Sequence, residues 1–85
     1  MSEPGSVMGR LDAIDVGPRK LTIQTEHFAR PTSRIETKVY LGGALKKVFT
    51  EEVASDDPDL QKILNRIHET RMSEIVSGLR GLQPQ

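Results

Sequence analysis

Apolar and polar residues alternate along two stretches of the chain with the two-residue period of a β-strand. Residues 20–28 form the first stretch, and Pro31 ends it because proline has no backbone N–H to donate to a neighbouring strand. Residues 35–53 form the second stretch, in which two strand-like runs flank Gly42-Gly43. A glycine pair between strands predicts a two-residue type I′ turn, since both central positions of that turn need positive φ. We therefore predict three consecutive strands in an antiparallel meander.

The predicted hairpin is apolar on both faces. A two-residue turn places Leu41 opposite Ala44, and alternation along the strands then gives a core face made of Ile35, Val39, Leu41, Ala44 and Val48. A second apolar patch falls on the other face, beside Lys38 and Lys47, and consists of Tyr40, Leu45 and Phe49. A β-bulge or a longer loop would shift this register by one residue and exchange the two assignments. Because one helix covers one face of a sheet, the second patch predicts a surface that meets a partner.

Residues 56–59 read Asp-Asp-Pro-Asp, which is typical of the start of a helix. Asp57 can cap the helix, and Pro58 suits the first helical position, where its missing N–H does no harm. We predict a helix from position 58 to position 77 or 79, with Gly78 and Gly81 at its exit. Its apolar stripe consists of Leu60, Ile63, Leu64, Ile67, Met72, Ile75 and Leu79. Arg71 projects near the centre of this stripe, and His68 lies just to one side.

These elements predict an α+β fold, in which a three-stranded antiparallel β-meander is followed by one long C-terminal α-helix. We assign residues 19–82 to a single small domain, residues 1–18 to a flexible N-terminal segment and residues 83–85 to a frayed C-terminus. Within the first segment, residues 11–16 could instead form a short strand or one helical turn that docks on the domain. We favour the flexible segment, since apolar residues are sparse there.

The size of the chain limits its core. A domain of 85 residues removes only about 60% of its unfolded surface from water, and this chain has three aromatic residues and no cysteine with which to strengthen the core. Self-association is therefore the expected source of additional stability, and we predict a homodimer.

Charge and hydropathy point to a cytoplasmic protein. Twelve basic residues balance twelve acidic ones, so no overall field draws the chain to nucleic acid or to a membrane. The first residues lack the basic start and the apolar stretch of a secretory signal, and no segment approaches the ~20 apolar residues that span a bilayer.

No motif predicts catalysis, a cofactor or a metal site. His68-Glu69 begins like the zinc motif H-E-x-x-H, but Met72 occupies the position of the second histidine. Gly42-Gly43 precedes a strand rather than a helix, which excludes a nucleotide-binding loop. We therefore expect no catalytic residues, no cofactor and no enzymatic activity.

Arg71, near the centre of the apolar stripe of the helix, carries a charge that must either pair with an acid or reach solvent. Arg71 either extends its guanidinium to the rim of the stripe or pairs across a dimer interface with an acid such as Glu36 or Glu51. The first outcome is the more frequent one for a long basic side chain.

The resulting hypothesis is a small cytoplasmic protein-interaction module, an adaptor or a regulatory subunit, that associates with itself and binds a protein partner. The predicted partner-binding residues are Tyr40, Leu45, Phe49, Met72, Val76 and Leu82. An alternative is a single-stranded nucleic-acid-binding module whose basic residues, next to sheet aromatics, are Arg30, Arg34, Lys38, Lys46 and Lys47. We favour the first, since lysines also protect strand edges from aggregation. A third hypothesis is a small ligand binder or enzyme with a site shared between subunits.

Overall fold

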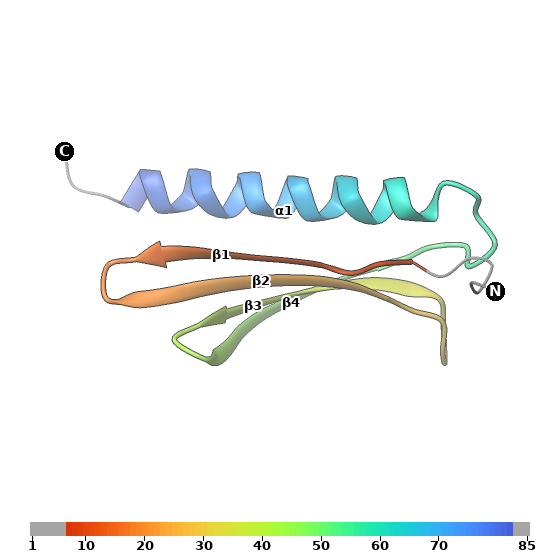
Figure 1. The fold of residues 1–85 in the computed structure, drawn as a ribbon, viewed down its shortest axis with the longest axis horizontal. Coiled ribbons are helices and arrows are strands. Elements are labelled where there is room, and N and C mark those ends of the chain that lie inside the picture. The colour runs from red at the N-terminus through yellow and green to blue at the C-terminus, as the bar shows by residue number, and fades with distance from the viewer. Residues whose placement is uncertain (1–6, 83–85) are drawn as a thin grey trace.

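The structure is a four-stranded antiparallel sheet followed by one helix (Figure 1). A computed structural model describes residues 7–82 and the side chains of residues 7–78. The elements are β1 (Arg10–Val16), β2 (Arg19–Phe28), β3 (Arg34–Leu41), β4 (Ala44–Glu52) and α1 (Leu60–Leu82). Each strand pairs with the next in the order β1-β2-β3-β4. The predicted α+β architecture, a meander with one C-terminal helix, is confirmed.

The number of strands differs from the prediction, because β1 occupies part of the segment that was expected to be flexible. A two-residue turn at Gly17-Pro18 joins β1 to β2, and Gly17 has φ 62°, as the first central position of a type II′ turn requires. Val16 pairs with Arg19, and the ladder continues to Arg10 opposite Thr25. Of the other residues that were expected to be flexible, Val7 packs on the core and the backbone of Met8 bonds Gln61, so that part of the prediction is also wrong. Residues 1–6 and 83–85 lie outside the described residues.

The hairpin between β3 and β4 has the predicted turn but not the predicted register. Gly42 and Gly43 have φ of 59° and 86°, and Leu41 pairs with Ala44. A register shift between Val39 and Tyr40 then follows, so that β4 contains one extra residue. A β-bulge turns every later side chain of β4 to the other face. The predicted faces of Val48 and Phe49 are therefore wrong and are exchanged in the structure.

The start of α1 has the predicted cap. The Asp57 carboxylate accepts a hydrogen bond from the backbone N–H of Asp59, with Oδ1 2.8 Å from the nitrogen. The helix begins at Leu60, two residues after the predicted start, and extends to Leu82, beyond both predicted ends at 77 and 79. Gly78 therefore lies inside the helix and not at its exit. A glycine in a helix interior costs about 1 kcal/mol relative to alanine, and this cost alone does not end a helix.

The core lies between α1 and one face of the sheet, and a polar layer divides it into two apolar clusters. The cluster near the start of α1 contains Ile35, Leu60, Leu64 and Ile67, with Val7, Val53 and Ile63 packed against it. The cluster near the sheet's hairpin turns contains Leu21, Ile23 and Val39, with Ile14, Val16, Leu41, Phe49, Met72 and Ile75 packed against it. The layer between them consists of the buried side chains of Thr25, Thr37 and His68.

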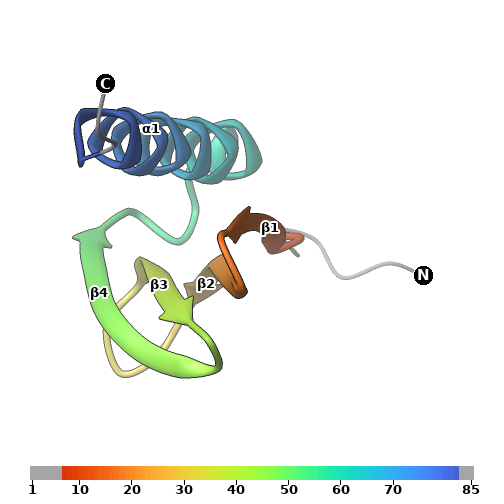
Figure 2. The same cartoon turned by 90° about the vertical axis from the view of Figure 1, so that its left-hand side faces the viewer.

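The other face of the sheet has no helix over it (Figures 1 and 2). We call it the open face, and its exposed large apolar side chains are Leu11, Leu45 and Val48. The molecule is elongated, with extents of 50 × 24 × 21 Å. The helix packs on β2 and β3, whereas β4 curves away from it toward the β3–β4 turn (Figure 2).

Candidate interaction surface

The fourth strand is an edge of the sheet that stays open to solvent. Eight of the nine residues of β4 are exposed, and Phe49 alone is half-buried. Among residues 7–82, β4 pairs with β3 alone, so its outer backbone N–H and C=O groups have no strand of this range beside them. We call this outer side of β4, with its side chains, the β4 edge.

The predicted partner-binding residues do not share one surface. Tyr40 and Leu45 pair with each other, and their side chains lie on the open face. Phe49 instead lies on the helix-facing side of β4, and Phe49 and Met72 both pack against the apolar cluster near the turns. Val76 is half-buried on α1, and the side chain of Leu82 lies outside those described.

Val48 takes the place on the open face that was predicted for Phe49. Its side chain is 44% exposed, and it pairs with Lys38 on the same face. Leu45 is 51% exposed, so β4 presents two large apolar side chains to solvent. Sequence reasoning missed Val48 because the register depends on the bulge, which the alternation of residues does not reveal.

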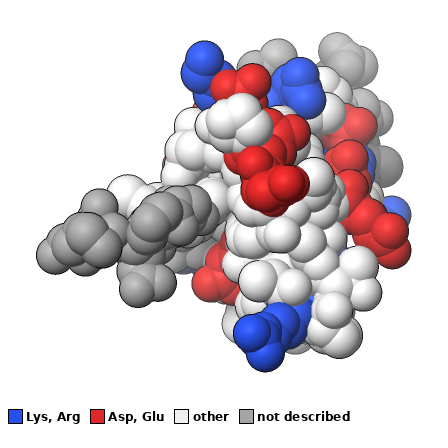
Figure 3. All heavy atoms as spheres, turned by 90° about the vertical axis from the view of Figure 1, so that its right-hand side faces the viewer, with Lys and Arg blue, Asp and Glu red and all other residues white. Residues whose placement is uncertain are grey.

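Charges are divided between the two ends of β4. Lys46 and Lys47 lie toward the β3–β4 turn, whereas Glu51 and Glu52 end the strand. The connection to α1 continues with three further acids: Asp56, Asp57 and Asp59. Acidic side chains accordingly gather on the end of the molecule that Figure 3 shows. The β4 edge is therefore basic at one end and acidic at the other.

Arg71 contacts β4 of its own chain. Its guanidinium lies 4.1 Å from the centroid of the Phe49 ring, and Nη2 is 3.4 Å from Oε2 of Glu51. Nη1 is 3.0 Å from Oε1 of Glu74 on the next turn of the helix, and Nε is buried with no hydrogen-bond partner among the side chains that the structure describes. The predicted partner Glu51 is thus present, but within one subunit, so this ion pair needs no dimer interface.

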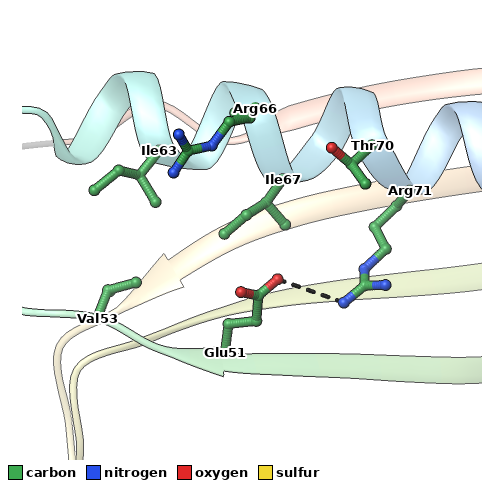
Figure 4. A pocket seen from close by; sticks show the side chains of 7 residues that line it. All are labelled: Glu51, Val53, Ile63, Arg66, Ile67, Thr70 and Arg71. Atoms are coloured by element: carbon green, nitrogen blue, oxygen red, sulfur yellow. Dashed lines mark hydrogen bonds and ion pairs between the residues drawn. The ribbon is translucent and has the colours of Figure 1, made fainter.

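A hollow of about 400 Å³ lies between α1 and the end of β4 (Figure 4). Its lining residues are Glu51, Val53, Ile63, Arg66, Ile67, Thr70 and Arg71. Glu51 and Val53 come from the sheet side and the others from α1, with the Arg71–Glu51 ion pair across one end. The hollow exists because α1 lies over β2 and β3 and leaves the flank of β4 uncovered.

The predicted basic residues are separated from one another, and three of their side chains contact groups of their own chain. On the open face, Arg34 bonds Glu36 at 2.7 Å and covers the Phe28 ring at 4.9 Å, while Lys38 lies 5.8 Å from the same ring. Lys47 lies on the helix-facing side, 5.0 Å from the ring of Phe49. Arg30 is exposed in the β2–β3 connection, and Lys46 is exposed at the bulge. Cations of the chain thus lie beside both phenylalanine rings.

His68 is the centre of a buried hydrogen-bond chain. Its Nε2 is 2.7 Å from Oδ2 of Asp12 on β1, and its Nδ1 is 2.7 Å from Oγ1 of Thr25 on β2. The Thr25 hydroxyl is in turn 3.1 Å from that of Thr37 on β3. Because a carboxylate only accepts, the Nε2–H of His68 donates to Asp12, and Nδ1 is left to bond the Thr25 hydroxyl. This chain ties α1 to three strands.

The order Asp-His-Thr is the arrangement that activates a hydroxyl nucleophile in hydrolases. Here the side chains of Thr25 and His68 are 0% exposed, and the Thr25 hydroxyl already bonds Thr37. Because both side chains are fully buried, these hydrogen bonds connect α1 to the sheet inside the core. Sequence reasoning singled out His68 but found no partners for it, since Asp12 lies in the segment that was expected to be flexible.

Two further properties limit the chemistry of residues 7–82. Across this range, no group of three or more histidine, aspartate or glutamate side chains is placed to hold a metal ion. The described helix is neither long enough in apolar sequence nor sufficiently free of charge to cross a membrane.

Comparison of the chain with protein-family models, with curated proteins and with solved structures finds no match.

Proposed function

We propose that this protein is a small protein-interaction module, an adaptor or regulatory subunit, that associates with itself through β4 and the adjoining open face. The observation that carries the proposal is the exposure of Leu45 and Val48 on β4, whose outer side pairs with no other strand among the described residues. Apolar side chains on a free strand edge are the groups that edge-to-edge pairing buries.

The size of the core supports the same proposal. Among the side chains that the structure describes, seven apolar ones are buried. A core of this size gives a small domain limited stability, and a second subunit adds apolar contacts that the single chain lacks. We further expect the module to act in the cytoplasm, because it uses none of the disulfides on which small secreted domains depend.

Light scattering coupled to size-exclusion chromatography tests the proposal on the full chain. We expect the wild-type protein to elute as a dimer at high micromolar concentration and Val48→Asp or Leu45→Asp to elute as a folded monomer. Leu11→Asp is the matched control, because Leu11 is 65% exposed on the same face but at the opposite edge of the sheet. A wild-type monomer at every concentration would contradict the proposal, as would equal effects of all three substitutions.

A further inference from the structure

We infer that two copies of the chain pair along their β4 edges, antiparallel and with Phe49 on the two-fold axis, to form one continuous eight-stranded sheet. This inference rests on the proposed function, because it names the surface and the register through which self-association takes place. Its basis is the order of charges along β4.

The charges of β4 are symmetric about Phe49 and opposite in sign. Lys47 lies two residues before Phe49, and Glu51 lies two residues after it. In an antiparallel pair centred on Phe49, Lys47 of each copy therefore stands opposite Glu51 of the other. Directly opposite residues of an antiparallel pair lie on one face with Cβ atoms ~4.5–5.5 Å apart, so each of these pairs attracts.

The side chains involved are on the correct face for this pairing. Glu51 lines the hollow and contacts Arg71, and Lys47 contacts Phe49, so both lie on the helix-facing side of β4. On the open face, Val48 stands opposite Thr50 of the other copy, and both residues are exposed in the single chain. Pairing thus buries the most accessible apolar group in the middle of β4.

Neighbouring registers lose this complementarity. Centring the pair on Val48 places Lys47 opposite Phe49, and centring it on Thr50 places Lys47 opposite Val53. Sliding one strand by a single residue against the other would instead place helix-facing side chains of one copy opposite open-face side chains of the other, because the side-chain period is two. Parallel pairing in register would place lysine beside lysine and glutamate beside glutamate.

The backbone of β4 permits the pairing. The irregularity of β4 lies near Lys46, so the five residues from Lys47 to Glu51 follow it and are regularly paired with β3. No helix covers this stretch, since α1 packs on β2 and β3 (Figure 2). Lys47 of the second copy then reaches Glu51 at the rim of the hollow, where that carboxylate also meets Arg71 (Figure 4).

Single cysteines introduced on the open face read the register directly, because the chain has no cysteine of its own. The proposed register places position 48 opposite position 50 of the other copy, whereas equal positions are diagonal and ~7–8 Å apart. We therefore expect a mixture of Val48→Cys and Thr50→Cys to form a disulfide-linked dimer under mild oxidation with oxidised glutathione. Each variant alone should stay unlinked.

Other cross-linking results would overturn the inference in distinct ways. Linkage of Val48→Cys to itself would centre the pair on position 48, and linkage of Thr50→Cys to itself would centre it on position 50. No linkage in any combination, with a wild-type dimer by light scattering, would leave self-association standing and remove β4 as the surface through which it takes place. A wild-type monomer would remove the proposed function as well.

Charge exchange gives an independent readout without cysteine. Lys47→Glu alone and Glu51→Lys alone place like charges opposite each other, and we expect each to weaken the dimer about tenfold or more in sedimentation equilibrium at low salt. Mixing the two variants restores both attractive pairs, so the mixture should form heterodimers that weaken with salt. Failure of the mixture to associate, with both variants folded by circular dichroism, would overturn the proposed register.

Discussion

The two edges of the sheet are held to the helix in different ways. On the β1 side, alternate residues each bond α1. The backbone of Met8, two residues before β1, exchanges two hydrogen bonds with the side chain of Gln61. Arg10 meets Asn65 at 3.5 Å and Glu69 at 2.9 Å, and Asp12 meets His68 at 2.7 Å. Along β4, the hydrogen-bonded contact to the helix is the Arg71–Glu51 ion pair at 3.4 Å.

Geometry explains why the contacts along β1 are regular. Two residues of a strand advance by about 6.6–6.8 Å and one helical turn by about 5.4 Å, so alternate β1 residues meet successive turns of α1. The helix runs beside β1 and cannot also cover β4 in a sheet of four strands. One helix is therefore bonded to the β1 edge through several side chains and to the β4 edge through one ion pair.

The largest expected effect comes from the buried hydrogen bonds of His68, which connect α1 to β1 and β2. His68→Ala removes the bonds to Asp12 and Thr25 and leaves a cavity between the two apolar clusters. We expect a loss of about 2–4 kcal/mol in the free energy of unfolding, measured by urea denaturation. Glu69→Ala is the control, because its exposed ion pair with Arg10 contributes less than about 1 kcal/mol. Equal effects of the two substitutions would contradict the structural role of His68.

A second substitution separates β1 from the helix without opening a cavity. Asp12→Ala leaves Nε2 of the fully buried His68 without its acceptor, which is expected to cost about 1–3 kcal/mol. Hydrogen exchange should then accelerate in β1 and remain slow in β2 and β3. Asp15→Ala on the exposed side of β1 is the control and should leave exchange unchanged. Unchanged protection of β1 in Asp12→Ala would show that its pairing with β2 suffices to hold it.

The difference between the edges also explains what the sequence predicts and what it does not. The β3–β4 turn and the start of α1 were predictable because a few neighbouring residues specify each of them. Gly42-Gly43 specify the turn, and Asp57 with Pro58 specify the helix start. The inward residues of β1 begin with Arg10 and Asp12, which bond the helix and therefore show no apolar period. A strand buried through polar contacts looks like a flexible segment in the sequence.

The candidate surface was predictable in part for a different reason. Tyr40 and Leu45 precede the register shift, so the turn fixes their pairing, whereas Val48 and Phe49 follow it. An inserted residue in an edge strand changes no local pattern, and tertiary packing decides which of the two apolar side chains enters the core. Phe49, the larger one, packs under Arg71 against the cluster near the turns. The partner-binding role of these residues stays a prediction.

An intermediate effect is expected where the chain passes from β4 to α1. Asp57→Ala removes the cap at the start of the helix and should lower the free energy of unfolding by about 1 kcal/mol. Asp56→Ala is the matched control, since Asp56 is an exposed neighbour of the same charge. Both substitutions remove one negative charge, so a difference between them in thermal denaturation isolates the cap. Equal shifts would mean that charge alone accounts for the effect.

The smallest expected effect concerns the contact between α1 and β4. The ion pair of Arg71 and Glu51 is partly exposed, with the Glu51 side chain 48% accessible, so solvent screens most of its attraction. A double-mutant cycle with Arg71→Met and Glu51→Gln should give a coupling free energy below about 1 kcal/mol. Methionine retains much of the apolar stem over Phe49, so the cycle reports the charges rather than the packing.

The same cycle distinguishes a weakly attached edge from a firmly attached one. The corresponding cycle across β1, with Asp12→Ala and His68→Ala, should give a larger coupling because one partner is fully buried. If the coupling at Arg71 and Glu51 equalled that at Asp12 and His68, the β4 edge would be as firmly held to the helix as the β1 edge. In that case the exposure of β4 would no longer indicate a surface that is free to pair with a second copy.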